Sequence, residues 1–452
     1  MKKIKRSFKK TAAAVLAAGL LIGAATPLSA NGAKESGEIS AVYNYSDGNA
    51  YRVYKEKYSG EKSSEADITL IGGEAVCTDK AGNEYKNTAI LAAGETVTYS
   101  FEVLQSGLYN IKLSYMPLGG NGEDITVRLT LDGAAPFSEA EKLTLPRMYK
   151  DSEGKRYDSY GNQYSPEQEE AGEFITKAFC DITGAENTPY AFYISAGSHS
   201  IALTCGDEPF ALEKIVIAAP DALSPYAEVE KSYKEKGFIS AEGEPIIVEG
   251  EDAALKSTRA IVPKADSTSP VPSPSDPKKQ IINYIGSSNW KSPEEEIIWK
   301  ISVKETGLYR LGAVFKQDQT VNGYSYRKLK IDGVVPFYEA LNLKFYYGTG
   351  WQYYEFADDG KEPYLFYLEK GEHTVSLTAT LSETAEFYNE LREITSALSD
   401  LYLEIAMITG ENPDKNRDYD LFKQIDGFND TLSANYGRLT KLANGMKKLS
   451  DG

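Results

Sequence analysis

The chain has 452 residues, 41% hydrophobic and 25% charged, which is enough for two to four globular domains. These proportions are those of an ordinary soluble protein and exclude a membrane bundle or a disordered chain. Asp and Glu number 66 against 49 Lys and Arg, so the formal net charge is −17. Because this charge repels phosphate groups, we expect no nucleic-acid partner.

The first 30 residues have the pattern of a secretory signal peptide. Basic residues between Lys2 and Lys10 precede an apolar run over 12–25, and Leu28-Ser29-Ala30 follows as a cleavage site. The run is shorter than the roughly 20 residues that span a bilayer, and no second such run follows. Cys77 is the first cysteine and lies too far along to carry a lipid anchor. We therefore expect a secreted, extracellular protein, either released or associated with the cell surface, without a transmembrane helix.

Only three cysteines occur, Cys77, Cys180 and Cys205, which excludes a disulfide scaffold. Two alternatives stay open: a Cys180–Cys205 bridge, or three small buried residues with free thiols. No two cysteines form a CxxC motif, so a zinc cluster is not expected.

An internal repeat organises the chain. Residues 128–140, RLTLDGAAPFSEA, return at 328–340 as KLKIDGVVPFYEA, and Gly107-Leu-Tyr returns as Gly307-Leu-Tyr. Farther on, Pro189-Tyr-Ala-Phe-Tyr with His199 matches Pro363-Tyr-Leu-Phe-Tyr with His373. The first interval is 200 residues and the second 174, so the first copy carries 26 additional residues between the two blocks.

Each copy consists of short alternating strands with Asp-Gly and Gly-x-His turns, a pattern typical of a β-sandwich. The predicted fold is mainly β, with two tandem jelly-roll modules, each preceded by a helix, and a C-terminal helical segment. The predicted boundaries are 1–30 for the signal, 47–220 and 224–380 for the modules, and 384–450 for the helical segment.

Local signals mark several of these elements. Tyr51, Tyr54 and Tyr58 have helical spacing, and Ser224 as N-cap with Gly237 as stop delimits the second helix. A Pro- and Ser-rich stretch over 262–277 predicts an exposed loop. Apolar stripes over 387–408 and 432–449 predict two long helices, the second running to the end of the chain without a cap, as expected for a piece of a longer protein.

The Gly-Leu-Tyr, Leu-Asp-Gly and Gly-x-His pattern, with the strand over 211–217, resembles the jelly-roll carbohydrate-binding modules of families 6 and 35. Their opening Glu-x-Glu strand is matched by Glu249-Gly-Glu251. The tandem modules with the helical stretch over 405–419 resemble the N-terminal part of large secreted bacterial solute-binding proteins of ABC transporters. The resemblance implies glycan binding, with transporter components reached through a missing C-terminal part. The two-lobed solute receptor itself would need some 300 further residues of alternating strands and helices.

The similar modules often hold a structural Ca²⁺ between the Glu-x-Glu and an acid on the final strand. The second copy has Glu249 and Glu251 but turns helical where the final strand belongs. The first copy has Glu213 on that strand and Glu74, with Gly72 in place of the other Glu. Because Ca²⁺ takes 6–8 oxygen ligands, each copy holds only part of a site. An acidic stretch from Asp414 to Asp420 lacks the Gly and Glu of an EF-hand and predicts a solvated turn.

Tyrosine is abundant, with 32 residues, and exposed tyrosine and tryptophan rings stack on sugars. The candidate ligand-binding residues fall in the additional segment of the first copy and after residue 289 in the second. The alternative is that most of these rings are core or loop-anchoring residues, as we expect for Trp299. The candidates are Tyr149, Tyr157, Tyr160, Asn162, Tyr164, Trp290, Tyr347, Trp351 and Tyr353.

We expect no enzyme, because the only histidines, His199 and His373, occupy equivalent places in the two copies. The acidic runs 294–296 and 167–170 are interpreted as solvated surface. The favoured function is a non-catalytic, glycan-binding region that takes a polysaccharide or oligosaccharide. The alternatives are an extracellular interaction scaffold that binds no sugar, or an accessory part of a polysaccharide-degrading enzyme; oligomeric state is not predicted.

Overall fold

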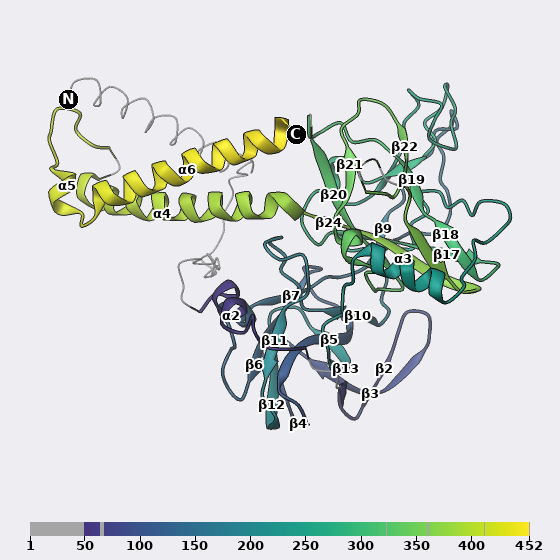
Figure 1. Ribbon diagram of the computed structural model, residues 1–452, viewed down its shortest axis with the longest axis horizontal. Coiled ribbons are helices and arrows are strands. Elements are labelled where there is room, and N and C mark those ends of the chain that lie inside the picture. The colour runs from purple at the N-terminus through teal and green to yellow at the C-terminus, as the bar shows by residue number, and fades with distance from the viewer. Residues whose placement is uncertain are drawn as a thin grey trace. The chain divides into compact units, whose positions relative to one another are not determined.

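The computed structural model describes residues 49–63, 67–321, 323–358, 360, 362–410 and 412–451. The chain divides into two compact units, one that holds both predicted β-modules and ends at Glu386, and a helical one from Phe387 onward (Figure 1). The predicted signal peptide at 1–30 lies outside the described residues.

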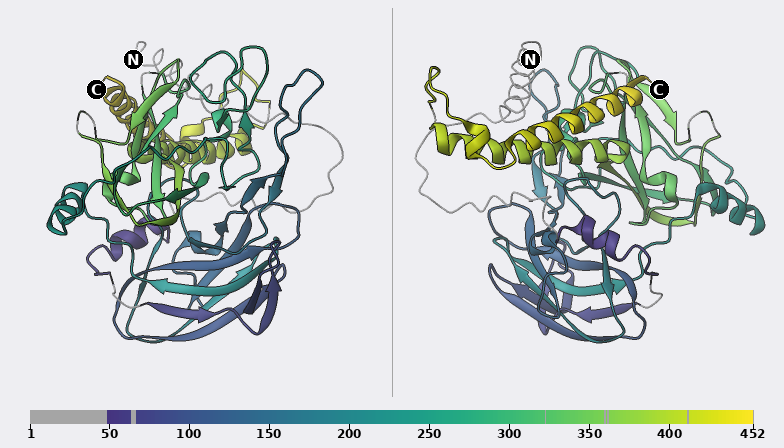
Figure 2. Two further views of the ribbon diagram at one scale, coloured as in Figure 1. Left: turned by 90° about the vertical axis from the view of Figure 1, so that its right-hand side faces the viewer. Right: turned by 60° about the vertical axis from the view of Figure 1, so that its left-hand side comes forward.

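The first module consists of one short helix and two antiparallel sheets that share a core. Its elements are α2 (Tyr51–Lys57), β1 (Ile68–Ile71), β2 (Ala75–Thr78), β3 (Glu84–Leu91), β4 (Thr96–Val103), β5 (Gly107–Pro117), β6 (Ile125–Leu131), η1 (Ser138–Glu141), β7 (Leu143–Leu145), β8 (Tyr149–Asp151), β9 (Gln168–Glu170), β10 (Ile175–Ala178), β11 (Ala191–Ile194), β12 (Gly197–Cys205) and β13 (Phe210–Ala218). The larger sheet has the order β10-β5-β13-β3-β2, with β1 also on β13 and β11 on β5; the smaller has the order β4-β12-β6-β7. Figure 2 shows these strands in two layers. Ile111, Leu129 and Ile215, one from each of three strands, are fully buried, as one-sided alternation requires.

The second module repeats this plan with a smaller core. Its elements are α3 (Tyr226–Glu235), β14 (Leu255–Lys256), β15 (Pro263–Lys264), β16 (Tyr284–Ile285), η2 (Ser287–Asn289), β17 (Glu296–Val303), β18 (Gly307–Arg310), β19 (Gly312–Phe315), β20 (Tyr324–Ile331), η3 (Tyr338–Leu341), β21 (Leu343–Tyr346), β22 (Gln352–Glu355), β23 (Leu365–Leu368), β24 (Gly371–Thr380) and η4 (Ser382–Thr384). Strands β21, β20, β24 and β17 form one sheet, while β15–β16, β18–β23 and β19–β22 are two-stranded pairs. The mainly β, jelly-roll-like prediction is confirmed.

The additional segment of the first copy extends the main sheet of the second. That sheet continues from β17 through β14 to β8 and β9, which belong to the first module. Lys256 of β14 is opposite Tyr149 of β8, and the Lys256 ammonium forms a buried ion pair with Asp151. The two modules are therefore joined by a shared sheet instead of a flexible linker, as their membership of one compact unit also indicates.

Each preceding helix is held by a glutamate from its own module. The Tyr51 amide donates to Glu139 Oε2 at 2.8 Å, and the Tyr226 amide donates to Glu339 Oε2 at 2.8 Å. The prediction of Ser224 as N-cap is wrong: Pro225 occupies that place, without a side-chain cap. The distant glutamate accepts the orphan N–H instead, because the repeated PF-x-EA motif brings it to the helix start.

In the described part of the second module, no strand corresponds to β13. After β24 the chain passes through η4 directly into a long helix. This confirms the prediction that the second copy becomes helical where the final strand belongs. The counterpart of β5 is formed by β18 and β19, which pair with β23 and β22. On the other side, Leu308 of β18 bridges Ser240, and within the described residues β19 pairs with no strand there.

The C-terminal unit is a pair of long helices. Its elements are α4 (Ala385–Thr409), α5 (Leu421–Gln424) and α6 (Phe428–Asp451). The Arg438 guanidinium donates to Glu390 at 2.7 and 2.9 Å and to Glu393 at 2.5 Å, which ties α6 to α4. The predicted helix stop is confirmed, since Gly410 has φ +72. Of the helices in the described segments, none is apolar over a length that could cross a membrane.

The cysteines and the Pro-rich stretch take simple roles. All three thiols are free, with Cys205 buried and the other two half-buried, so the disulfide alternative is wrong. The 262–277 stretch is a loop after β15, as predicted, but only about half of its residues are exposed, and residues 263 and 272 are buried. Its ends are held by Asn283, whose side-chain amide donates to Asp266 O and Pro274 O at 3.0 Å.

Candidate functional site

A buried arginine, Arg147, fixes the start of the β8–β9 hairpin. Arg147 is 1% exposed and donates to Glu208 and Glu170 and to the carbonyl oxygens of Glu123 and Leu118. A buried guanidinium needs such a complete set of acceptors, and these partners fix where β8 leaves the first module. The hairpin strands pair Tyr149 with Glu170, which projects the connecting loop away from the core.

A capped turn shapes the tip of this hairpin. Asp158 Oδ1 accepts the amides of Tyr160 at 2.8 Å and Asn162 at 2.9 Å, and its Oδ2 accepts the Asn162 side-chain amide at 2.9 Å. The Asn162 side chain is the first of the hydrogen-bond partners that hold the pKa of the Asp158 carboxyl below its usual value. Gly161 has φ +82, a conformation that favours glycine. The turn is therefore built from local side-chain to backbone bonds.

Three tyrosines stand exposed on this capped tip. Tyr157, Tyr160 and Tyr164 are 51%, 82% and 55% exposed. Arg156, Tyr157, Tyr164 and Ser165 line an open hollow of about 640 Å³. The sequence prediction thus placed three candidate rings correctly at the surface, and two of them at one hollow.

The other predicted residues of this segment have structural roles. Tyr149 is buried, and its hydroxyl donates to Gly122 O at 3.3 Å. Asn162 Oδ1 accepts the Gln280 amide at 2.9 Å, and the Gln163 amide donates to Gln280 O at 2.7 Å. These bonds hold the hairpin tip against the loop of the second module.

The candidates in the second module are separated from this hollow and mostly packed. Trp290 lies under the Arg327 guanidinium, 4.1 Å from the ring centroid, and donates its Nε1–H to Glu295 O. Trp351 donates to Asp266 Oδ2 at 2.8 Å, and Tyr347 is half-buried. Tyr353 is 66% exposed, and its hydroxyl contacts Glu355 Oε1 at 3.3 Å. Of this group, only Tyr353 presents a largely free ring.

Trp299, predicted to be core, packs against core residues while half-buried. Its Nε1–H donates to Gly250 O at 2.9 Å, which anchors the loop carrying the predicted calcium-site glutamates.

The predicted calcium ligands divide into two unequal groups. In the first module, Glu213 Oε2 accepts from Ser114 at 2.6 Å, while Glu74 is exposed. In the second, Glu251 is 7% exposed and its Oε2 has no hydrogen-bond partner. Burial, with Glu249 and Asp252 as further causes, raises the pKa of Glu251 to about 7.

The buried Glu251 Oε2, which has no hydrogen-bond partner, could bind a cation, but its surroundings do not supply the other ligands that a cation needs. Among the described residues, no three His, Cys, Asp or Glu side chains come together as a metal-binding group. In the part of the chain that the structure describes, the second module has no final strand to supply a counterpart of Glu213. The residues at hand therefore supply fewer oxygens than the 6–8 that Ca²⁺ takes.

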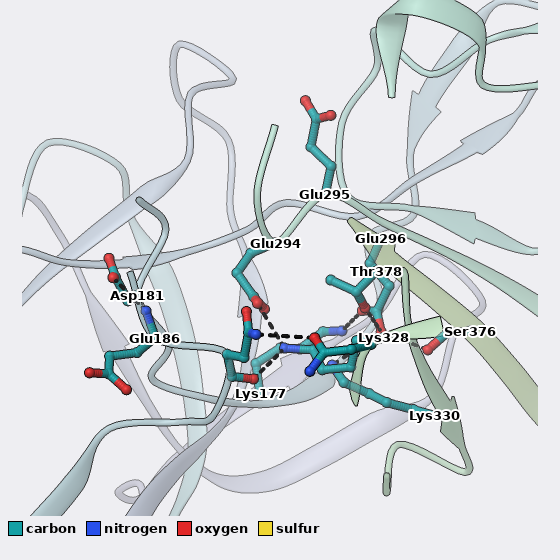
Figure 3. Close-up of polar contacts among 12 residues, drawn as sticks. Lys177, Asp181, Glu186, Glu294, Glu295, Glu296, Lys328, Lys330, Ser376 and Thr378 are labelled. Atoms are coloured by element: carbon teal, nitrogen blue, oxygen red, sulfur yellow. Dashed lines mark hydrogen bonds and ion pairs between the residues drawn. The ribbon is translucent and has the colours of Figure 1, made fainter. Parts of the chain in front are cut away.

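An ion-pair cluster between the modules was not predicted. Glu296 of β17 is 4% exposed and lies between Lys177 of β10 and Lys330 of β20 (Figure 3). Its Oε1 also accepts Ser376 Oγ–H at 2.7 Å and Thr378 Oγ1–H at 3.2 Å. Burial alone would raise the pKa of Glu296, but the two lysines outweigh it and hold the pKa well below its usual value.

The interpretation of 294–296 as solvated surface is therefore wrong for two of its three acids. Besides Glu296, Glu294 accepts from the nearly buried Lys328 at 2.7 Å, and Lys328 also donates to Asn187 O of the first module at 3.2 Å. A signal was available: Glu296 directly precedes the alternating strand over 297–301, which makes it part of a sheet.

The two histidines make equivalent contacts in the two copies. His199 Nδ1 is 2.7 Å from Asp132 Oδ2, and His373 Nδ1 is 2.6 Å from Asp332 Oδ2. His199 Nε2 lies 3.3 Å from Ser195 Oγ, which gives a triad-like order, yet it is closer to Ser195 O, at 2.9 Å.

The second copy makes the same contact without a serine. There His373 Nε2 lies 2.8 Å from Glu369 O. Because both copies keep the carbonyl contact, the pattern fastens the strand start at β12 and β24.

Comparisons with known proteins describe both units. Residues 386–452 match the family model described as "Bacterial solute-binding protein, 4-helix bundle domain". No curated protein matches the chain. Among solved structures, it is similar to a family 35 carbohydrate-binding module from Clostridium thermocellum, at 13% identity and TM-score 0.20 over 35% of this chain and 95% of that one. It is similar to a CBM35 module from Cellvibrio japonicus, at 12% identity and TM-score 0.22 over 34% and 95%.

Larger proteins match through a part of their length. The chain spans 28% of the GH26-CBM35 β-(1,4)-mannanase of Podospora anserina, at 12% identity and TM-score 0.19 over 36% of this chain. At such identities and TM-scores, these similarities carry no argument about a ligand. The C-terminal segment thus matches a solute-binding protein bundle, and carbohydrate-binding modules are among the structural neighbours of the chain.

Proposed function

We propose that this chain is a non-catalytic glycan-binding region of a secreted bacterial solute-binding-type protein. The observation that carries the proposal is the capped hairpin tip, which holds three exposed tyrosines with Arg156 and Ser165 beside an open hollow. Exposed aromatic rings beside hydrogen-bonding groups suit a ligand that has apolar ring faces and many hydroxyls. A polysaccharide or oligosaccharide has this chemistry.

The tip is pre-organised for such a ligand. Asp158 and Asn162 fix the turn before any ligand arrives, so little conformational entropy is lost when a sugar stacks on Tyr160. The ion pair between Arg156 and Glu167, at 3.0 Å, keeps a charged group beside the hollow. Neighbouring hydroxyls of a sugar can accept from the guanidinium.

The match of the C-terminal unit to a solute-binding protein bundle supports the setting. In this proposal the β-unit holds a glycan near the cell surface, and the polypeptide that completes the solute-binding protein passes smaller sugars to membrane transporter components. The contacts of the two histidines support a non-enzymatic role, because both imidazoles of the chain contact backbone carbonyl oxygens at the start of a strand.

The test is affinity gel electrophoresis of the full chain through plant and bacterial polysaccharides. We expect retardation by at least one glycan, and a loss of affinity of about tenfold or more in Tyr157→Ala and Tyr160→Ala, since aromatic anchors carry a large share of binding energy. Tyr338→Ala is the matched control, because Tyr338 is 56% exposed and lies outside the hairpin. Tyr353→Ala reports whether the second module also binds.

The outcomes separate the candidate functions. Equal retardation of the hairpin variants and wild type would move the site elsewhere. No retardation by any glycan would favour an interaction scaffold, an alternative that the shared sheet and the buried inter-module ion pairs support, since they join the two modules.

A further inference from the structure

The first module shows what the second one lacks. Strand β13 lies between β5 on one side and β1 and β3 on the other, and its inward residues Leu212, Ile215 and Ile217 are fully buried. It thus closes the larger sheet and supplies one strand of the core. In the described chain, the second module has counterparts of the flanking segments and none of β13.

Within the described residues, β19, the second half of the counterpart of β5, has one edge that pairs with no strand. Leu311 O accepts the Phe356 amide at 2.9 Å, and Gln317 O accepts the Gly348 amide at 2.8 Å, both on the side of β22. Since successive residues of a strand direct their backbone groups to alternate sides, the N–H and C=O of Gly312, Val314 and Lys316 face the opposite side. In the first module that side pairs with β13.

Burial changes at the same positions. Ser114 is 3% exposed beneath β13, whereas the equivalent Val314 is 49% exposed. Ile111 and Tyr115 are fully buried, while their counterparts Leu311 and Phe315 are half-buried. The second core is therefore open along one strand.

The second module also has a counterpart of β1, the strand on the other side of β13, and within the described residues this counterpart is unpaired. Trp299 Nε1–H donates to Gly250 O just as Tyr99 Oη–H donates to Gly72 O, so the loop before β14 corresponds to the one after β1. Residues 246–248 then correspond to residues 68–70, the first three of β1. Ile246, Ile247 and Val248 form no strand and are 40%, 80% and 39% exposed.

From this slot, bordered by the unpaired edge of β19 and by residues 246–248, the counterparts of strands on either side of β13, we infer that the second module binds an extended β-strand of a partner polypeptide. The strand runs antiparallel to β19, as β13 does to β5, and has apolar side chains at the alternate positions that face Leu311 and Phe315. Main-chain hydrogen bonds to Gly312 and Val314 hold it, and the alternate apolar residues give selectivity. This inference is independent of the proposed glycan site.

A partner strand is a better occupant than a second copy. In the described chain, the strand with the required pattern, β13, is already paired on both edges. The net charge of −17 also opposes close approach of two copies. An exposed strand edge has unpaired backbone N–H and C=O groups, and a strand of another chain can form hydrogen bonds with them.

The probe is a synthetic, fluorescently labelled peptide with the sequence of β13, FALEKIVIA. Its binding to the full chain is measured by fluorescence anisotropy, and the site by amide hydrogen exchange. We expect saturable binding with added protection over 310–316. A peptide with serine in place of Leu212, Ile215 and Ile217 should bind at least tenfold more weakly, because it cannot fill the open core.

Two variants test the edge itself. Val314→Pro removes the outward N–H while the β19–β22 hydrogen bonds, made by the odd-numbered residues, remain, and proline is tolerated at a sheet edge. We expect it to weaken the peptide at least tenfold, and the control Val314→Thr, which keeps the N–H, to bind like wild type. Unchanged tryptophan fluorescence of both variants shows that they fold.

Several results would overturn the inference. Equal binding of the native and serine-substituted peptides would show non-specific adhesion. Protection of 312–316 in the free monomer would show that the chain itself already fills the slot. Protection that appears together with concentration-dependent dimers would assign the edge to a second copy.

Discussion

The buried carboxylate of Glu296 is the contact whose loss we expect to cost the most. It accepts from two lysines and two hydroxyls while 4% exposed, and one of the lysines, Lys177, belongs to the other module. Glu296→Gln keeps the size of the side chain but leaves Lys177 and Lys330 without a counter-charge. Breaking a buried ion pair from one side costs about 3–5 kcal/mol, and we expect a loss of this size in the free energy of unfolding.

The assay is urea unfolding followed by tryptophan fluorescence. All three tryptophans, Trp290, Trp299 and Trp351, lie in the second module, so the signal reports the unit in which Glu296 is buried. The control is Glu141→Gln, which breaks the half-exposed pair with Arg128 and should change the midpoint little. Lys177→Met should lower the free energy of unfolding less than Glu296→Gln does, because Glu296 still forms its ion pair with Lys330.

The effect should depend on pH in a defined direction. Because the folded pKa of Glu296 lies well below 4.5, its stabilisation is fully present above about pH 4.5 and is lost as pH falls through the folded pKa. The difference between wild type and Glu296→Gln should therefore shrink in acid. A loss at pH 7 no larger than that of Glu141→Gln would refute the reasoning that this cluster holds the modules together.

The remaining predictions concern other titrating groups. Hydrogen bonding to Asp332, with Glu369 O as second cause, raises the pKa of His373, so the stabilisation by this contact is present below about pH 6.5 and is lost as pH rises through the folded pKa. His373→Gln should lower the free energy of unfolding by at most about 1 kcal/mol, because Asp332 is half exposed. A variant whose melting temperature depends on pH between 5 and 9 as that of wild type does would contradict this prediction. Burial raises the pKa of Glu251 to about 7, so the folded state holds the proton more tightly and stability falls between about pH 4.5 and 7 by on the order of 2 kcal/mol once solvent screening is allowed for. Glu251→Gln should abolish that fall.

Much of the architecture follows from local patterns. Period-2 alternation and Asp-Gly turns predicted the strands of both modules. The repeat predicted that β17 and β20 would copy β4 and β6 at an interval of 200 residues, and that β24 would copy β12 at 174. The helical stripes after residue 386 predicted α4 and α6, and the disagreement of the two repeat intervals located the additional hairpin. These signals are local, because each depends on neighbours within one element.

The candidate site was predicted only in part. The exposed rings of Tyr157, Tyr160 and Tyr164 follow from a loop rich in polar residues, but the same aromatic pattern in Tyr149 and Trp290 leads to buried or covered rings. Which ring faces water depends on whether its strand pairs with another module, and spacing along the chain does not contain that information.

The sequence by itself determined the repeat, the β-sandwich class, the position of the inserted hairpin and the helical C-terminal unit. Tertiary structure alone decided that the hairpin completes the sheet of the other module, that Glu296 is buried between Lys177 and Lys330, and that one edge of the second sandwich is open. The physical reason is that alternation and turns are local properties of the chain, whereas strand pairing and charge burial depend on residues far apart in the sequence, such as Lys177 and Glu296, that meet only in the folded protein.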